Sequence, residues 1–363
     1  MDVLVRIEPR HPAQQGLTAA RKRQMQLGAL VSIGVATVVL SRFALKAWSN
    51  RSGKIALAEG QPETKEGVNA AQQGDWPTFE KLYCDRPPSD RYHFLRGVGA
   101  LSKLDGPTPP PNSATAATID AGLRLGWAWR HRGDGLGETI NQRGAENMAR
   151  LLGEAASLLD NREDLDSVAC ALRIRIEMGL GGSRGVLQQQ LNAAAALNQP
   201  NIFVPINHLM FIAPKWYGSV DEILDVAKDY AAQETNPAWK ALPAMAHAEC
   251  WLYRSLMADS ITEKREANSY YFGDAFRGEI EALDDEFWSA RNNSTAPVSH
   301  AELTFAHNQF AYLFYTFGGS SRLDRHLDYI GKDLTRFPWA YAGLEIEHGG
   351  ALSAIREQAG RTN

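Results

Sequence analysis

The spacing of apolar residues constrains the fold of this chain most strongly, because it follows the helical period almost throughout. From residue 65 onward, apolar side chains recur every three or four positions, and Gly, Pro or short polar runs divide the segments. The alternation that is typical of strands is confined to residues 3–7 and 202–206, and Pro205 interrupts the second run. The pattern therefore predicts an all-α fold.

The connections between the expected helices are short, which predicts that neighbouring helices pack antiparallel. At the clearest junction a turn ends at Gly218, Ser219 can cap the next helix, and Glu222 completes a capping box. Successive antiparallel pairs are typical of a tetratricopeptide-like α-solenoid, which we predict here although no roughly 34-residue signature recurs cleanly. The expected helices cover residues 66–73, 89–103, 115–132, 138–159, 164–178, 184–197, 202–212, 237–257, 270–289, 300–317, 321–332 and 351–358, with two more opening at Trp76 and Ser219.

An uncharged stretch near the start of the chain predicts a membrane span. The eighteen residues 24–41 carry no charge and would extend about 27 Å as a helix, close to the roughly 30 Å of a bilayer core. Apolar residues continue to Trp48, so we predict one transmembrane helix over residues 24–48. A signal peptide fits less well, because the nearest small-x-small triplet, at residues 56–58, lies beyond four more positive charges. A buried soluble helix remains an alternative, since Gly and Ala are frequent in the stretch.

The remaining segments follow from this span. A basic N-terminal tail covers residues 1–23, a polar linker covers 49–64, and a helical-repeat domain covers 65–363. Within that domain, the sequence DGPTPPPNS excludes helix and predicts a hinge near residues 105–113. Five basic residues precede the span and four follow it, so the positive-inside rule leaves open on which side of the membrane the domain lies.

The charge distribution bears on possible partners. Residues 1–54 hold nine of the 38 basic residues and two of the 42 acidic ones, which leaves a main body of 29 basic and 40 acidic residues. Such a body repels phosphate backbones, so we expect no nucleic-acid partner. The basic segment flanks the apolar stretch, where it would meet anionic lipid headgroups, and we expect the lipid bilayer as a partner of residues 24–48.

No pattern of catalytic, metal-binding or cofactor-binding residues stands out. The three cysteines are far apart, which predicts neither a disulfide framework nor a zinc site. The glycine-rich segments 133–138 and 179–185 follow helices rather than strands and are expected to be loops. His300 and His307 lie seven residues apart without an evident third ligand, and His247 and Glu249 would point in different directions on one helix. We therefore expect no catalytic residue, metal ion or cofactor.

Two short clusters combine aromatic rings with cations, as interfaces for carboxylates and peptides often do. The alternative interpretation is that the tryptophans fill gaps between helix layers while the basic groups reach outward. The candidate binding residues are Trp127, Trp129 and Arg130 in the first cluster and Lys215, Trp216 and Tyr217 in the second.

The second cluster also carries a family resemblance. Residues 213–227 (APKWYGSVDEILDVA) contain a Lys-Trp-x-Gly-Ser motif and resemble an actinobacterial family of unknown function, in which Ala-Lys-Trp-Gly-Gly-Ser precedes an acidic helix start. Residues 127–133 (WAWRHRG) are similar to a Trp-Ala-Trp-Glu-Ala-Arg-Gly segment there. The likeness covers roughly residues 65–290 and departs from the family at Tyr217 and at residues 225–228 (DVAK). It implies a helical, tetratricopeptide-like fold and no particular reaction, and a transmembrane anchor is not a feature of that family.

These features together favour a membrane-anchored, single-pass helical-repeat scaffold that binds a protein or peptide partner. One alternative is an enzyme or small-ligand binder with a pocket between helices near residues 215–249. A buried polar pocket with titratable groups in contact would favour this alternative, whereas a dry aromatic core would contradict it. Another is a structural homo-oligomer formed through the aromatic surface of the last helices.

Overall fold

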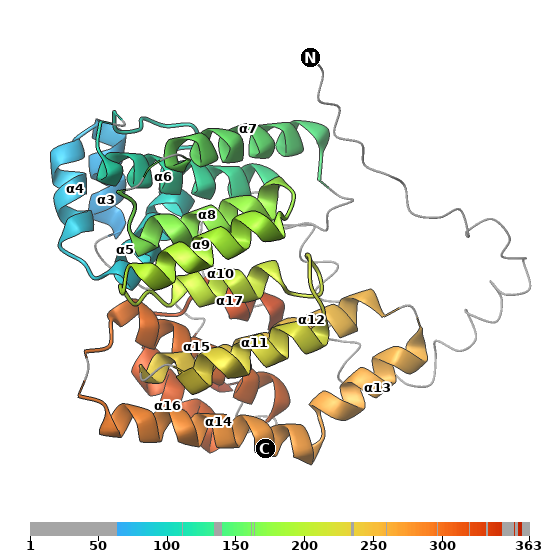
Figure 1. The fold of residues 1–363 in the computed structure, drawn as a ribbon. Helices are drawn as coiled ribbons and strands as arrows, with labels where there is room; N and C mark the ends of the chain where they lie inside the picture. Colours follow the sequence, from blue (N-terminus) through green and yellow to red (C-terminus); the bar gives the residue numbers. More distant parts are fainter. Residues whose placement is uncertain are drawn as a thin grey trace, which may run out of the picture. The chain divides into compact units, whose positions relative to one another are not determined.

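The described part of the chain consists of helices and the turns between them, with no strand, which confirms the predicted all-α fold (Figure 1). The computed structural model describes residues 64–110, 112–133, 140–160, 162, 164–233, 236–258, 260–295, 297–318, 320–331, 333–342, 352 and 355–357. The predicted tail over residues 1–23, the transmembrane helix over 24–48 and almost all of the linker lie outside these residues. Within them, every helix is too short or too polar to cross a bilayer.

The helices begin close to the expected positions, and polar caps explain several starts. Asp75 accepts a hydrogen bond from the Thr78 N–H, and Ser113 accepts one from the Ala116 N–H. The elements are α3 (Thr64–Gln73), α4 (Trp76–Cys84), α5 (Pro88–Leu101), α6 (Ala114–Arg132), α7 (Gln142–Leu159), α8 (Ser167–Leu180), α9 (Arg184–Ala196), α10 (Phe203–Phe211), α11 (Val220–Gln233), η4 (Pro237–Ala241), α12 (Leu242–Met257), α13 (Ile261–Tyr271), α14 (Asp274–Asn293), α15 (His300–Phe317), α16 (Ser320–Ile330), α17 (Arg336–Trp339) and η5 (Ala340–Ala342).

Helices that follow one another in the chain pack against each other, as α6 does on α7, α8 on α9 and α11 on α12 (Figure 1). Helix α8 also contacts α6 on one side and α10 on the other, and α10 contacts α12. The paired helices therefore stack in chain order from α6 to α12.

The inner side of this stack is covered by two helices from distant parts of the sequence. Helices α5 and α15 contact each other, and α5 packs on α8 while α15 packs on α12. The Ser89 hydroxyl donates to Glu302 at 3.0 Å, and the Ala301 N–H donates to Asp90 at 2.6 Å. Because α8 and most of α12 are buried on all sides, no bare concave face runs along these helices.

Three expectations about helices were wrong. The segment 237–257 divides into η4 and α12, and the helix expected over 270–289 begins only at Asp274 because α13 ends before Gly273. Helix α13 was missed because its sequence, ITEKREANSYY, buries only Ala267 and Tyr271 and shows little apolar periodicity. The strand-like run at 202–206 is helical, in agreement with the helix expected over 202–212, because Pro205 lies in the first turn of α10, where its missing N–H is tolerated.

The proline-rich segment lies between α5 and α6 and is non-helical where it is described, as expected. Asp105 ties it to α6 and α7, because its carboxylate is 3.2 Å from His131 Nε2 and 3.5 Å from Arg150 Nη2. These contacts hold the start of the segment against the stack.

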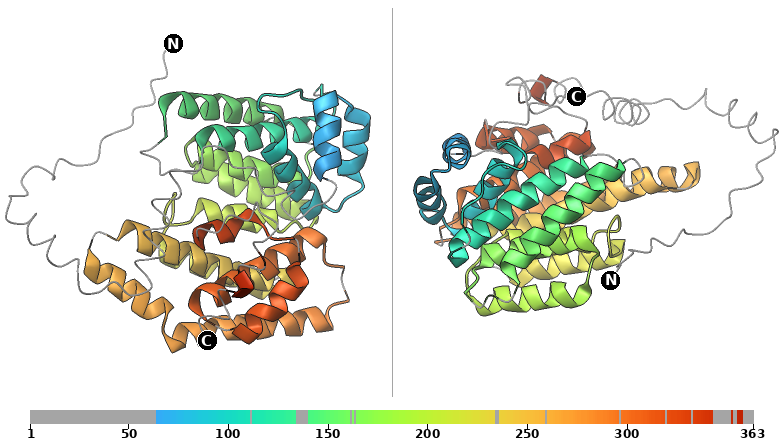
Figure 2. Two further views of the ribbon diagram at one scale, coloured as in Figure 1. Left: turned by 180° about the vertical axis from the view of Figure 1, so that it is seen from behind. Right: turned by 90° about the horizontal axis from the view of Figure 1, so that it is seen from above.

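Aromatic side chains of the later helices are mostly buried, including Tyr271, Phe276, Phe287 and Phe310. Three exposed apolar residues lie at the ends of α13, where Ile261 is 69%, Tyr270 43% and Phe272 48% exposed, and Tyr329 and Phe337 are exposed further along the chain. Figures 1 and 2 show α13 at an edge of the helical array. The exposed aromatic residues of the last helices are thus divided among α13, α16 and α17.

Candidate functional site

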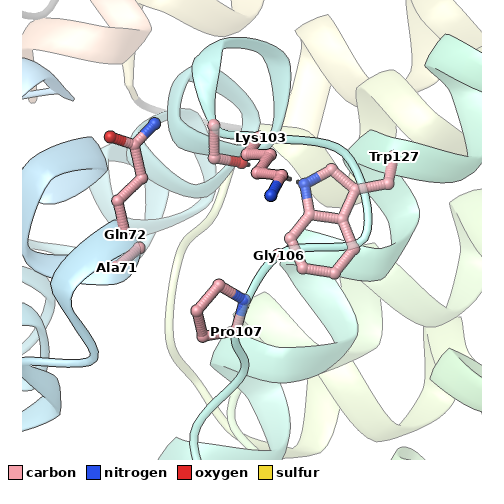
Figure 3. A pocket seen from close by; sticks show the side chains of 7 residues that line it. Ala71, Gln72, Lys103, Gly106, Pro107 and Trp127 are labelled. Atoms are coloured by element: carbon pink, nitrogen blue, oxygen red, sulfur yellow. Dashed lines mark hydrogen bonds between the residues drawn. The ribbon is translucent and has the colours of Figure 1, made fainter.

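Trp127 and Arg130 join α6 to the end of α5. The Trp127 ring is buried beside Pro107, and its Nε1–H donates to the Ser102 hydroxyl at 2.9 Å (Figure 3). Arg130 donates to two backbone carbonyls, Ser102 at 2.5 Å and Gly99 at 3.3 Å. Both side chains therefore hold the two helices together.

A hollow of about 240 Å³ lies beside Trp127. Its charged lining residues already pair with other side chains, since Arg124 contacts Asp120 and Glu154, and Arg150 contacts Glu154. An incoming charged ligand would have to displace these partners. The lining residues are Asp105, Gly106, Thr108, Arg124, Trp127, Arg150 and Leu151.

Trp129 and Trp216, one from each predicted cluster, meet in space although 87 positions separate them in the sequence. Trp129 lies in the last turn of α6, and Trp216 lies in the turn after α10. Their ring centroids are 5.9 Å apart with the planes at 90°, an edge-to-face contact. Both side chains are only partly buried, so this contact lies where the core reaches the surface.

Two arginines place their guanidinium groups over these rings. The Arg132 Cζ is 5.7 Å from the centroids of both rings, and the Arg175 Cζ, from α8, is 4.4 Å from that of Trp129. Such cation–π contacts hold a guanidinium in place without neutralising its charge. We call Trp129, Arg132, Arg175 and Trp216 the Trp129–Trp216 site.

Arg175 is the most unusual member of this site. Burial lowers the pKa of its guanidinium, which is therefore poorly hydrated. In the part of the chain that the structure describes, its hydrogen-bond partner is the Met178 sulfur at 3.5 Å, and no carboxylate lies within ion-pair distance. The charge of Glu249 acts on Arg175 from a distance, but this carboxylate pairs with Lys215. A partly buried cation without a contacting counter-ion is unfavourable, and an anionic ligand would relieve this.

The two indole groups add donors to the same site. The Nε1 atoms of Trp129 and Trp216 are buried, and neither has a hydrogen-bond partner among the described residues. A buried N–H without an acceptor destabilises a protein by about 1–3 kcal/mol. The site therefore combines two guanidinium groups with two unsatisfied indole donors.

Lys215 lies next to Trp216 in the sequence, but its ammonium group forms an ion pair with a carboxylate of the protein. Its Nζ is 2.5 Å from Glu249 Oε2, and Glu249 is buried in α12. The Tyr341 hydroxyl, from η5, donates to Glu249 Oε1 at 2.5 Å and accepts from Lys215 Nζ at 3.2 Å. Burial, and then the charge of Glu249, raises the pKa of Tyr341 well above its usual value, so the phenol stays protonated.

Tyr217 fixes the turn that carries Trp216. Its hydroxyl donates to the Met178 carbonyl at 2.9 Å, and its ring lies against Gly182. Gly182 has a φ of +76°, and a Cβ there would lie 2.5 Å from the tyrosine ring, so this position requires glycine. Residues 181–183, at the centre of the glycine-rich segment 179–185, thus form the turn between α8 and α9, and the ends of the segment belong to these helices.

The pairs considered in the sequence, His247 with Glu249 and His300 with His307, do not come together in the structure. His247 Nε2 is 3.2 Å from Glu279, whereas Glu249 pairs with Lys215. His247 and Glu249, both in α12, therefore contact different partners. His300 Nε2 is 3.6 Å from Asp333 and does not join His307. Among the described residues, no group of three or more His, Cys, Asp or Glu side chains is placed to hold a metal ion.

The sequence suggested Trp129 and Trp216 but missed Arg175 and Tyr341. Arg175 lies in SVACALRIRIEMGL, an almost continuously apolar helix, and a cation in such a segment was the available signal. Tyr341 lies in a short segment without helical periodicity, and no sequence pattern linked it to Glu249.

Comparison with known proteins adds no relative to these observations. No family model matches the chain, and searches of curated proteins and of solved structures found no match.

Proposed function

We propose that this chain is a membrane-tethered helical-repeat scaffold that binds a protein or peptide partner through a carboxylate held at the Trp129–Trp216 site. The observation that carries the proposal is Arg175, a partly buried guanidinium over Trp129 without a carboxylate partner in the described residues. A peptide carboxylate would supply the missing counter-ion and accept hydrogen bonds in the same contact.

The position of the site supports a peptide rather than a fully enclosed ligand. All four of its residues are partly buried, and Tyr217 beside them is exposed. The aromatic faces offer contact area to a flanking apolar side chain, while the guanidinium groups offer fixed donors. Because the inner side of the stack is covered by α5 and α15, the partner would bind at this edge and not along a concave groove.

The tether and the repeat fold are separate parts of the proposal. The uncharged residues 24–41 and the basic residues around them favour a span over 24–48, and helices that pack in chain order favour a tetratricopeptide-like solenoid. Fractionation of the intact protein tests the tether. We expect it to resist alkaline extraction from membranes, and release into the soluble fraction would contradict the span.

Peptide binding can be tested with the full-length protein in detergent on a random peptide array. We expect wild-type protein to select peptides with Asp, Glu or a free C-terminal carboxylate. Arg175→Met should weaken binding of the selected peptides about tenfold or more, since a hydrogen bond to a charged group contributes about 1.5–3 kcal/mol.

Arg265→Met is the matched control, because Arg265 is an exposed residue of α13 and loses the same charge. It should bind like wild type. Equal binding by the Arg175→Met protein, or selection of peptides without an acidic group, would contradict the proposal.

A second candidate function is favoured by the contact of Lys215, Glu249 and Tyr341. Three titratable groups meet there in a largely buried setting, as a small-ligand or catalytic site between helices would require. A thermal-shift screen of small metabolites tests it, with Glu249→Gln as the variant. A ligand that stabilises wild type but not the variant would favour this function over a peptide scaffold.

A further inference from the structure

A separate chain of polar side chains runs between α14, α15 and α16. Asp284, His307 and His326 are each fully buried, with 0% of their surface exposed. Asp284 Oδ1 is 2.9 Å from His326 Nε2, and the Nδ1 atoms of His326 and His307 are 2.8 Å apart. The chain ends where His307 Nε2 lies 2.8 Å from Arg291 Nη1. We call these four residues the Asp284–Arg291 chain.

The chemistry of its two ends fixes the direction of every hydrogen bond. Arg291 can only donate, so His307 Nε2 must accept, and the proton of a neutral His307 therefore lies on Nδ1. This proton is donated to His326 Nδ1, and His326 then carries its own proton on Nε2, which donates to Asp284. Each nitrogen has a single role, and both imidazoles are neutral.

The electrostatics agree with neutral imidazoles. Burial, and then the neighbouring His326 and the positive charge of Arg291, lowers the pKa of His307 to about 2. Burial also lowers the pKa of His326, although the neighbouring Asp284 opposes this effect. Burial raises the pKa of Asp284, but hydrogen bonds and charges from His326, Arg322 and Arg325 outweigh it and lower the pKa overall.

The outer end of the chain presents guanidinium groups on aromatic faces. The Arg291 Cζ is 4.4 Å from the Tyr329 ring centroid and 5.2 Å from that of Trp288, and the Arg325 Cζ is 4.3 Å from the Trp288 centroid. Tyr329 stacks on His307 with the centroids 3.8 Å apart. Arg325 and Tyr329 are exposed at the surface.

Among the groups that contact one another here, positive charge exceeds negative charge, with the exposed Asp324 and Asp328 also on α16. Arg322 pairs with both Asp284 and Asp285, and Arg325 shares the same Oδ2 atom of Asp284. Arg291 contacts the neutral His307, and no carboxylate among the described residues lies within ion-pair distance of it. Three guanidinium groups thus face two carboxylates, which leaves one positive charge without a counter-ion.

We propose that Arg291 and Arg325 bind a phosphate group over Trp288 and Tyr329, and that His307 orients Arg291 for this contact. Arg291 uses one N–H for His307 and Arg325 uses one for Asp284, which leaves further donors on both guanidinium groups. The two groups come from different helices, and a tetrahedral phosphate presents oxygens to both, whereas a planar carboxylate presents only two oxygens.

Calorimetric titration of the full-length protein with inorganic phosphate, at constant ionic strength, tests this site. We expect saturable binding that weakens about tenfold or more in Arg291→Gln and in Arg325→Gln. Arg265→Gln, the exposed control on α13, should bind like wild type. Phosphate binding that is absent, or equal in all three variants, would overturn the proposal, and so would tighter binding of acetate than of phosphate.

The orienting role of His307 has its own test. His307→Leu keeps all three arginines but removes the acceptor for Arg291, so phosphate affinity should fall, whereas attraction by charge alone would leave it unchanged. His307→Gln supplies an amide oxygen as acceptor and should restore part of the affinity. Equal affinity in His307→Leu and wild type, with circular dichroism showing a native fold, would remove the orienting role.

Discussion

The Trp129–Trp216 site and the Asp284–Arg291 chain both contain arginines stacked on aromatic rings. They differ in how completely their polar groups are hydrogen-bonded within the protein. In the chain, Asp284, His326 and His307 each have a hydrogen-bond partner, and Arg291 donates to His307. In the site, Arg175 contacts only a weak sulfur acceptor, and two indole donors have no partner among the described residues. The buried Asp284, His326 and His307 are satisfied within the protein and stabilise its fold, whereas Arg291, the Trp288 indole beside it and the groups of the Trp129–Trp216 site keep donors for a ligand.

Removing Asp284 should have the largest effect on stability. Asp284→Ala leaves Arg322, Arg325 and His326 without their shared acceptor in a buried position, and such a loss lowers the free energy of unfolding by about 3–5 kcal/mol. Urea unfolding measures the change. Asp285→Ala is the control, because this exposed partner of Arg322 should contribute at most about 1 kcal/mol. Equal effects of the two substitutions would contradict a structural role for the Asp284–Arg291 chain.

Acid should weaken the same region. The folded-state pKa values of His307 and His326 lie below the unfolded value near 6.5, so the unfolded chain takes up protons first as the pH falls. Their contribution is present above about pH 6.5 and decreases below it, and for His307 the decrease between pH 7 and pH 5 is about 2 kcal/mol. We expect a shallower decrease in His307→Gln than in wild type. Parallel curves of unfolding free energy against pH would show that His307 titrates normally.

Tyr341 allows a smaller test at the edge of the Trp129–Trp216 site. Tyr341→Phe removes the hydroxyl that donates to Glu249 and should lower the free energy of unfolding by about 1.5 kcal/mol. Tyr270→Phe is the matched control, because Tyr270 is exposed and its hydroxyl makes only a long 3.5 Å hydrogen bond to Glu279. If both variants unfold like wild type, Lys215 alone satisfies Glu249 and Tyr341 does not join the pair.

Arg175 should show the smallest effect on stability and the clearest contrast with Asp284. Arg175→Met keeps an unbranched side chain on Trp129 but removes a partly buried charge without a counter-ion, so stability should be unchanged or rise by about 1 kcal/mol. Thermal unfolding measures it. A loss of several kcal/mol would mean that Arg175 has a structural partner and is not held for a ligand.

Much of the fold could be predicted from local pattern, because helical periodicity and caps such as Asp75 act within a few residues. Helix α13 could not, since its packing on α12 and α14 supports a sequence with little periodicity of its own. The fit of α5 against α15 also could not be predicted, because residues such as Ser89 and Glu302 meet only in the folded chain.

The two sites were also only partly predictable from the sequence. Trp129 and Trp216 could be named because aromatic rings next to cations are visible in the sequence, but their contact depends on the stacking of α6, α8 and α10. His307 was considered with His300, its neighbour on one helix, whereas its partner His326 lies on the next helix. Spacing within a helix reveals only local pairs, and both sites are built from long-range contacts.

The most direct test of carboxylate binding at the Trp129–Trp216 site is calorimetric titration of one array-selected peptide in two forms, with its carboxylates free and with them amidated. We expect wild-type protein to bind the free form about tenfold or more tightly than the amidated form, and Arg175→Met to lose this preference. Equal affinity of wild type for the two forms would contradict a carboxylate-binding site at Arg175.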